Sequence, residues 1–124
     1  MPRPVHFEMN FENLERAKEF YGSVFGWTFQ KFGADAEPYW LVTTGADGEM
    51  GINGGLMGRH PGMQPGTVNT MGVESVDAAV DTIKSAGGSI AMEKMAVPGM
   101  GWVAYATDPE GTLFGVFEMD SNAA

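Results

Sequence analysis

Two titratable side chains near the start of the chain have the spacing expected of partners in acid–base chemistry. His6 and Glu8 are separated by one residue, so both lie on the same face of an extended strand. An imidazole beside a carboxylate in a cleft can take up and release protons near neutral pH. The plainer alternatives are a polar His6 that is hydrogen-bonded to Glu8 or Asn53, and a partly solvated Glu8. The pair is therefore an acid–base candidate with a purely structural alternative.

Several other chemistries are excluded by what the sequence lacks. The chain has no cysteine, which rules out a disulfide, a zinc–thiolate site, an iron–sulfur cluster and a thiol nucleophile. No Gly-x-Ser-x-Gly motif is present for a serine nucleophile. The glycine-rich segment at residues 51–55 opens no helix, so it is not a phosphate-binding loop. Its glycines are expected to let a ligand or the opposite strand come close.

The charge balance narrows the range of partners. The formal net charge is −9 at pH 7, and the acidic residues are spread along the chain, so the overall field repels phosphate backbones. Nucleic acids and anionic membrane surfaces are therefore not expected as partners. No apolar run approaches the length of a membrane span, and Glu8 precedes any apolar run that could serve as a signal segment. We expect a cytoplasmic protein.

An internal repeat organises the elements that must position His6 and Glu8. An offset of 62 residues places Met71 on Met9 and Trp102 on Trp40, and it needs no gap. The hydrophobic patterns of the two copies agree as well as these identities. The sequence thus predicts one domain over residues 1–124, built from a module at 4–57, a linker at 58–66 and a module at 67–119.

Each copy has the pattern of one strand, one helix and three further strands. Apolar and polar residues alternate over residues 5–11, as in a strand with one buried face. Asn13 and Ser75 are N-cap candidates, each ahead of apolar residues at helical spacing. The later strands are expected at 27–31, 39–44 and 51–57 in the first copy and at 89–94, 102–106 and 112–118 in the second. Each copy is therefore βαβββ.

Several short phrases within the copies point to a known superfamily. The second copy carries Val-Asp-Ala-Ala-Val at 76–80, Ala-Gly-Gly at 86–88, Val-Pro-Gly-Met-Gly-Trp at 97–102 and Asp-Pro-Glu-Gly-Thr-Leu-Phe-Gly at 108–115. The first copy carries Asn-Leu-Glu-Arg-Ala at 13–17, Phe-Tyr at 20–21 and Phe-Gly-Trp at 25–27. In this order and spacing, these short motifs resemble those of the vicinal oxygen chelate superfamily, which contains glyoxalase I, bleomycin-resistance proteins and extradiol dioxygenases. The likeness is greatest to small bacterial glyoxalase-like proteins related to lactoylglutathione lyase.

The resemblance implies an α+β fold in which tandem βαβββ modules form a cup-shaped sheet pair. Metal-dependent members of the superfamily place four ligands on the first and last strands of the two modules. The matching positions here are His6, Asn53, Val68 and Gly115. One imidazole and one amide do not hold a transition metal, and valine and glycine supply no ligand atom. We therefore expect no metal and no other cofactor.

Strand alternation predicts which side chains line the cup of the resemblance. His6 and Glu8 are the catalytic candidates on that surface. Trp102 is expected at its rim, where a flat ligand could stack. The expected ligand-contacting residues are Asn53, Met57, Val68, Thr70, Trp102, Leu113, Gly115 and Phe117.

Two functions from different classes follow from this reading. The first is a metal-independent, glyoxalase-like enzyme of lyase or isomerase type that acts on a small carbonyl or hydroxylated compound, with His6 and Glu8 handling protons. The second is a non-enzymatic protein that binds or sequesters a small molecule, like the bleomycin-resistance branch. A metal-dependent lyase or dioxygenase is a further alternative. The resemblance also implies a homodimer, because members commonly complete the cup with a neighbouring module.

Overall fold

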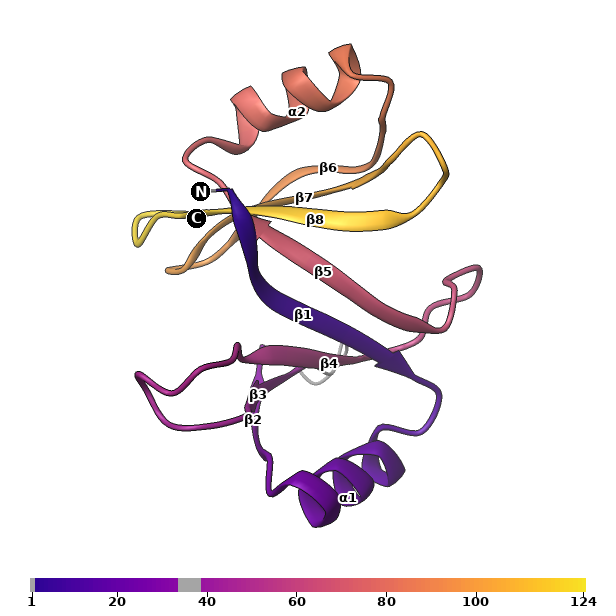
Figure 1. The fold of residues 1–124 in the computed structure, drawn as a ribbon, viewed down its shortest axis with the longest axis vertical. Coiled ribbons are helices and arrows are strands. Elements are labelled where there is room, and N and C mark those ends of the chain that lie inside the picture. Colours follow the sequence, from indigo (N-terminus) through magenta and orange to yellow (C-terminus); the bar gives the residue numbers. More distant parts are fainter. Residues whose placement is uncertain (1, 34–38) are drawn as a thin grey trace. The chain divides into compact units, whose positions relative to one another are not determined.

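The computed structural model describes residues 2–33 and 39–124 as two compact units. The first unit comprises His6–Thr67, and the second comprises Val68–Ala124 together with the start of the first strand, up to Val5. Each unit is built on one βαβββ module (Figure 1). The α+β fold of two such modules, which the repeat predicts, is confirmed. No helix among the described residues is long and apolar enough to cross a membrane.

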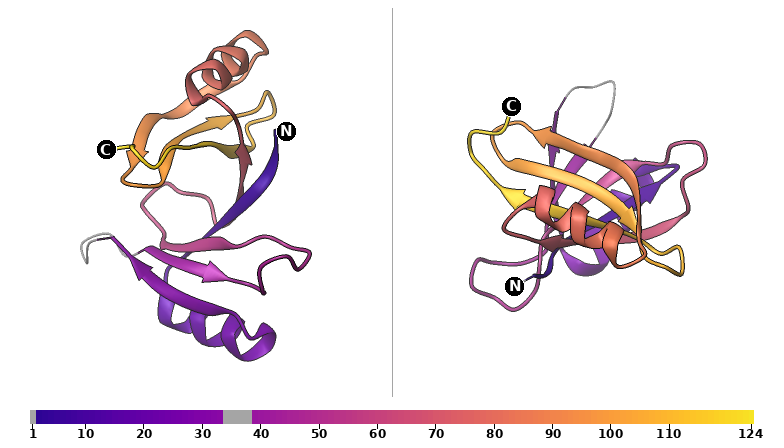
Figure 2. Two further views of the ribbon diagram at one scale, coloured as in Figure 1. Left: turned by 90° about the vertical axis from the view of Figure 1, so that its left-hand side faces the viewer. Right: turned by 90° about the horizontal axis from the view of Figure 1, so that it is seen from above.

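The first unit is a four-stranded sheet with one helix. Its strand order is β2-β3-β4-β1, with β1 and β4 parallel and the other pairs antiparallel. The helix lies along one face of the sheet, as Figure 1 and the left view of Figure 2 show. The elements are β1 (Arg3–Phe11), α1 (Leu14–Phe25), β2 (Thr28–Phe32), β3 (Tyr39–Thr43) and β4 (Gly54–Gly58).

Local sequence explains where α1 begins and ends. The side chain of Asn13 accepts a hydrogen bond from the backbone N–H of Arg16 at 3.0 Å, as an N-cap does. Gly26, with φ of 72°, ends the helix in the left-handed conformation. The apolar stripe of α1 covers a core of Met9, Val42 and Leu56. Because Met9 faces α1, alternation turns His6 and Glu8 to the opposite, open face of the sheet.

The second unit repeats this arrangement. Its strand order is β5-β8-β7-β6, with β5 and β8 parallel and the other pairs antiparallel. Val76, the first residue of the helix, packs with Ala104 and Val116 of the sheet in the buried core of this unit. The elements are β5 (Gly66–Gly72), α2 (Val76–Ser85), β6 (Ser89–Val97), β7 (Gly101–Thr107) and β8 (Leu113–Met119).

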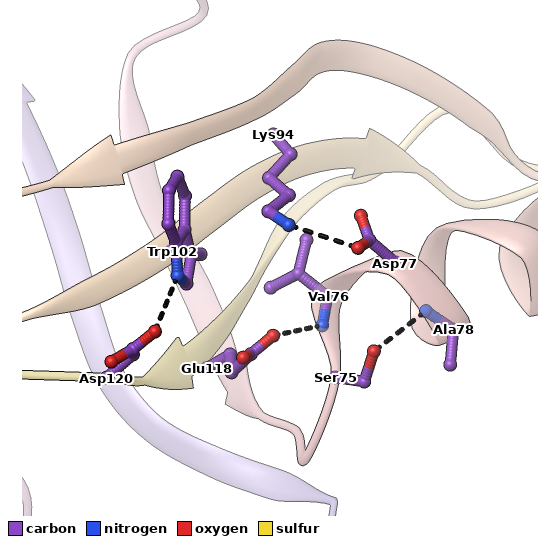
Figure 3. Close-up of polar contacts among 8 residues, drawn as sticks. All are labelled: Ser75, Val76, Asp77, Ala78, Lys94, Trp102, Glu118 and Asp120. Carbon is purple, nitrogen blue, oxygen red and sulfur yellow. Dashed lines mark hydrogen bonds and ion pairs between the residues drawn. The ribbon is translucent and has the colours of Figure 1, made fainter. Parts of the chain in front are cut away.

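The start of α2 is capped by two side chains, which Figure 3 shows together. Ser75 Oγ accepts from the backbone N–H of Ala78 at 3.1 Å, as predicted for an N-cap. Glu118 Oε1, from the end of β8, accepts from the backbone N–H of Val76 at 2.9 Å. Glu118 therefore lies on the face that α2 covers and ties the last strand of its sheet to the helix.

Candidate functional site

A chain of three hydrogen-bonded side chains occupies the open face of the first unit. His6 and Glu8 project from β1, and Tyr39 is the first residue of β3. Tyr39 Oη donates to Glu8 Oε2 at 2.7 Å, and His6 Nε2 lies 3.1 Å from the same hydroxyl. The structural alternative drawn from the sequence has His6 hydrogen-bonded to Glu8 or Asn53. In the structure His6 is instead hydrogen-bonded to Tyr39, which also binds Glu8.

Tyr39 is a site residue that the local sequence does not reveal. Tyr39 and Trp40 are adjacent on β3, so strand alternation places their side chains on opposite faces of the sheet. Trp40 packs toward α1, where Lys18 Nζ lies 3.3 Å from its ring centroid. Its link to Glu8 depends on pairing across three strands, since β3 reaches β1 only through β4. That pairing is not visible in the local sequence of either strand.

Gly55 makes room for the tyrosine. It lies on β4 between its partners Glu8 on β1 and Leu41 on β3. A Cβ atom at this position would collide with the hydroxyl and ring of Tyr39, the ring atom Cε1 being 2.8 Å away. The expectation that these glycines permit a close approach thus has a specific physical reason here: the tyrosine lies over the strand.

Burial sets the charge of His6. The pKa of His6 is lowered from its ordinary value of 6.5, mainly because burial penalises the charged imidazolium, while the negative charge of Glu8 acts in the opposite direction. The imidazole is consequently neutral at neutral pH. A neutral imidazole can accept a proton, as a general base requires.

Two other polar residues of the first unit have partners outside this chain of hydrogen bonds. The strand expected at residues 51–57 begins later, at Gly54, so Asn53 precedes β4 and is exposed. Its Oδ1 accepts a hydrogen bond from the backbone N–H of Thr44 at 2.9 Å. Buried Asn10 donates to the backbone carbonyl of Gln64 at 3.0 Å and accepts from Arg59 Nε at 2.7 Å. Both side chains hold loops in place.

Met57 lies on the same open face as the three hydrogen-bonded residues. It pairs with Asn10 on β1 and with Tyr39 on β3, and it is half-buried. Its neighbour Leu56 is fully buried beneath α1, so alternation turns Met57 to the other side. Met57 therefore lies on the same face of the sheet as His6 and Glu8.

The second unit gathers most of the remaining candidates on its own open face. Val116 packs beneath α2, so its neighbours on β8 face away from the helix. Thr70, which is buried, pairs with Gly115, and a Cβ on Gly115 would lie 3.1 Å from the Thr70 hydroxyl. The candidates on this face are Val68, Thr70, Leu113, Gly115 and Phe117.

Trp102 lies on the other face, against α2, rather than with these residues. Its indole Nε1 donates to Asp120 Oδ2 at 3.0 Å, and Lys94 Nζ is 4.7 Å from the ring centroid (Figure 3). The indole hydrogen bond is the main cause that lowers the pKa of Asp120. Register explains the placement, because Trp102 pairs with Glu118, whose carboxylate caps α2. Trp102 is thus part of the structural core of its unit.

The ligand set does not fit a transition metal. Within residues 2–33 and 39–124, no three His, Cys, Asp or Glu side chains come together as a metal site would need. Of the four positions that match the superfamily's metal ligands, Val68 and Gly115 offer no side-chain donor, and the Asn53 oxygen holds Thr44. The residues at these positions therefore do not form the donor set that a transition metal needs.

Comparisons with known proteins agree with this architecture. The proteins described as "Putative glyoxylase CFP32" from Mycobacterium tuberculosis and Mycobacterium bovis are each 30% identical to this chain over 122 residues, covering 93% of it and 45% of their own length. The chain thus spans about half the length of these curated relatives.

Solved structures show the same fold. Methylmalonyl-CoA epimerase from Mycobacterium tuberculosis has a TM-score of 0.69 at 18% identity, covering 94% of this chain and 87% of that one. A methylmalonyl-CoA epimerase in complex with methylmalonyl-CoA and NH4+ has a TM-score of 0.74 at 15% identity, covering 100% and 99%. The model of the Glyoxalase/Bleomycin resistance protein/Dioxygenase superfamily matches residues 3–116, and the chain belongs to this superfamily.

Proposed function

We propose that this protein is a metal-independent acid–base enzyme that binds a small carbonyl or hydroxylated compound on the open face bearing His6 and Glu8. The single observation that carries this proposal is the chain from His6 through Tyr39 to Glu8, with distances of 3.1 and 2.7 Å. The neighbour in complex with methylmalonyl-CoA supports it in one respect, because a protein of this fold there binds an acyl-CoA thioester.

His6 acts as the base in this proposal. Its pKa is lowered by burial, so the ring is neutral and ready to accept a proton from the bound compound at neutral pH. The imidazolium that forms is stabilised through Tyr39 by the negative charge of Glu8, which raises the pKa of His6. Glu8 therefore favours the charged state that the reaction creates, and the proton returns to the product from the same ring.

A screen by thermal shift, followed by a turnover assay of each hit, tests the proposal. A compound that binds only the native state raises the unfolding midpoint. We expect His6→Gln to lower turnover by about 100-fold or more, the usual contribution of a general base, while binding is retained. His60→Gln is the matched control, because His60 is exposed in the linker. Turnover that survives in His6→Gln would refute the assignment of the base.

The second candidate function is non-enzymatic binding or sequestration of a small molecule. The superfamily that matches this chain includes bleomycin-resistance proteins, which favours this class. The same screen separates the two functions. Saturable binding without turnover, unchanged by Glu8→Gln, supports sequestration, whereas turnover that depends on His6 supports the enzyme.

A further inference from the structure

The donor and acceptor roles in the hydrogen bonds of Tyr39 determine which nitrogen of His6 carries the proton. A tyrosine hydroxyl has one proton and can accept through its lone pairs. Tyr39 gives that proton to Glu8 Oε2 at 2.7 Å, because an ionised carboxylate only accepts. Toward His6 Nε2, at 3.1 Å, the same oxygen therefore acts as the acceptor. The proton of this second bond comes from the imidazole ring.

We infer that Tyr39 is a positioning residue that fixes neutral His6 with its proton on Nε2, so that Nδ1 is the acceptor the site offers to a ligand. The ligand class that matches is a compound presenting a polarised O–H, N–H or acidic C–H group, rather than an anionic oxygen. The inference rests on the proposed function only for the location of the ligand site, because which nitrogen of His6 carries the proton is a property of the protein without ligand.

Other features of the first unit agree with this assignment. No described residue donates a hydrogen bond to Nδ1 of His6, so the described part of the chain does not compete with a ligand for that nitrogen. The carboxylate of Glu8 accepts from the same tyrosine hydroxyl that contacts His6, and the chain carries a formal net charge of −9. Both charges disfavour an anionic ligand at this point.

The arrangement depends on Gly55 as well as on the hydroxyl. Because a Cβ at Gly55 would collide with Tyr39, Gly55→Ala must displace the ring from its place beside His6 and Glu8. Gly58→Ala is the matched control on the same strand, since nothing lies within 4 Å of a Cβ there. Comparing the two substitutions distinguishes the effect of displacing Tyr39 from any general effect of an alanine in β4.

Nitrogen NMR of the two histidines tests the inference without any ligand. At about pH 8, where imidazole is neutral, long-range proton–nitrogen spectra distinguish the two neutral forms of the ring. We expect His6 to be held in the single form with the proton on Nε2, and exposed His60 to average between both forms. A wild-type His6 that averages like His60, or that carries the proton on Nδ1, overturns the inference.

Substitutions then test the role of Tyr39. Tyr39→Phe and Gly55→Ala should each let His6 average between both forms, whereas Tyr21→Phe and Gly58→Ala should leave it in one form. Tyr21→Phe removes the same atom from a tyrosine of α1 that packs against the core of the first unit. A His6 ring that stays in one form in both Tyr39→Phe and Gly55→Ala overturns the inference even if the wild-type form is as expected.

The ligand class is tested with phenol and anisole, which differ in the hydroxyl proton, and with acetate as an anion. Phenol should move the Nδ1 resonance of His6, while anisole and acetate should not. A response to anisole or acetate as large as that to phenol, or no response to phenol, overturns the ligand class. A His6 ring held in the expected form in a protein that turns over no compound would instead contradict the proposed function alone.

Discussion

His6 links the stability of the protein to pH through its burial. Its pKa is lower in the folded protein than the ordinary value of 6.5, so the unfolded chain binds more protons between the folded pKa and 6.5. The free energy of unfolding therefore contains a contribution that is complete above about pH 6.5 and is lost as the pH falls toward the folded pKa. Glu8 moderates this loss because its charge favours the imidazolium.

We predict that His6→Gln removes this part of the pH dependence. Urea unfolding of the wild type and the variant, measured on both sides of pH 6.5, isolates the contribution of His6 from that of other titrating groups. The wild type should lose more stability than His6→Gln when the pH is lowered. Equal losses in the two proteins would show that burial does not lower the pKa of His6.

The helices and strands show how far the sequence predicts the site. Alternation in β1 and the N-caps at Asn13 and Ser75 are local, and the structure has both as predicted. Tyr39 and Trp102 are different cases, because their surroundings depend on register between strands distant in sequence. The local sequence pattern therefore predicts the helices and strands of each unit. The contacts of individual side chains can be predicted only when the pairing of the strands in the sheet is known.

The two caps at the start of α2 lead to a prediction about stability. Ser75→Ala removes the acceptor for the backbone N–H of Ala78 and should cost about 1 kcal/mol, the usual value for a lost N-cap. Glu118→Ala leaves the buried Val76 without its acceptor and should cost about 1–3 kcal/mol. Urea unfolding measures both, with Ser85→Ala, at the exposed end of the helix, as the control. Costs no larger than that of Ser85→Ala would contradict the capping roles.

At the scale of the whole molecule, apolar surface on α1 supports the prediction of a homodimer. Phe20, Val24 and Phe25 are 57%, 54% and 60% exposed, and large apolar side chains exposed together commonly mark an interaction surface. We expect sedimentation velocity to give twice the mass of one chain, with a dissociation that is promoted by replacing Phe20 and Phe25 with serine. Met50→Ser, in an exposed loop, is the control. A mass of one chain at every concentration would contradict the dimer.

We propose that the side chains of this protein, rather than a transition metal, carry its chemistry. Elemental analysis of protein purified without a histidine tag, followed by titration with Ni²⁺, Zn²⁺, Fe²⁺ and Mn²⁺, tests it most directly. We predict no stoichiometric metal and no saturable binding at His6, because one imidazole and one amide do not hold these ions against chelators, and the matching positions Val68 and Gly115 supply no donor. One metal ion per chain that is lost in His6→Ala would contradict the account and indicate a metalloenzyme.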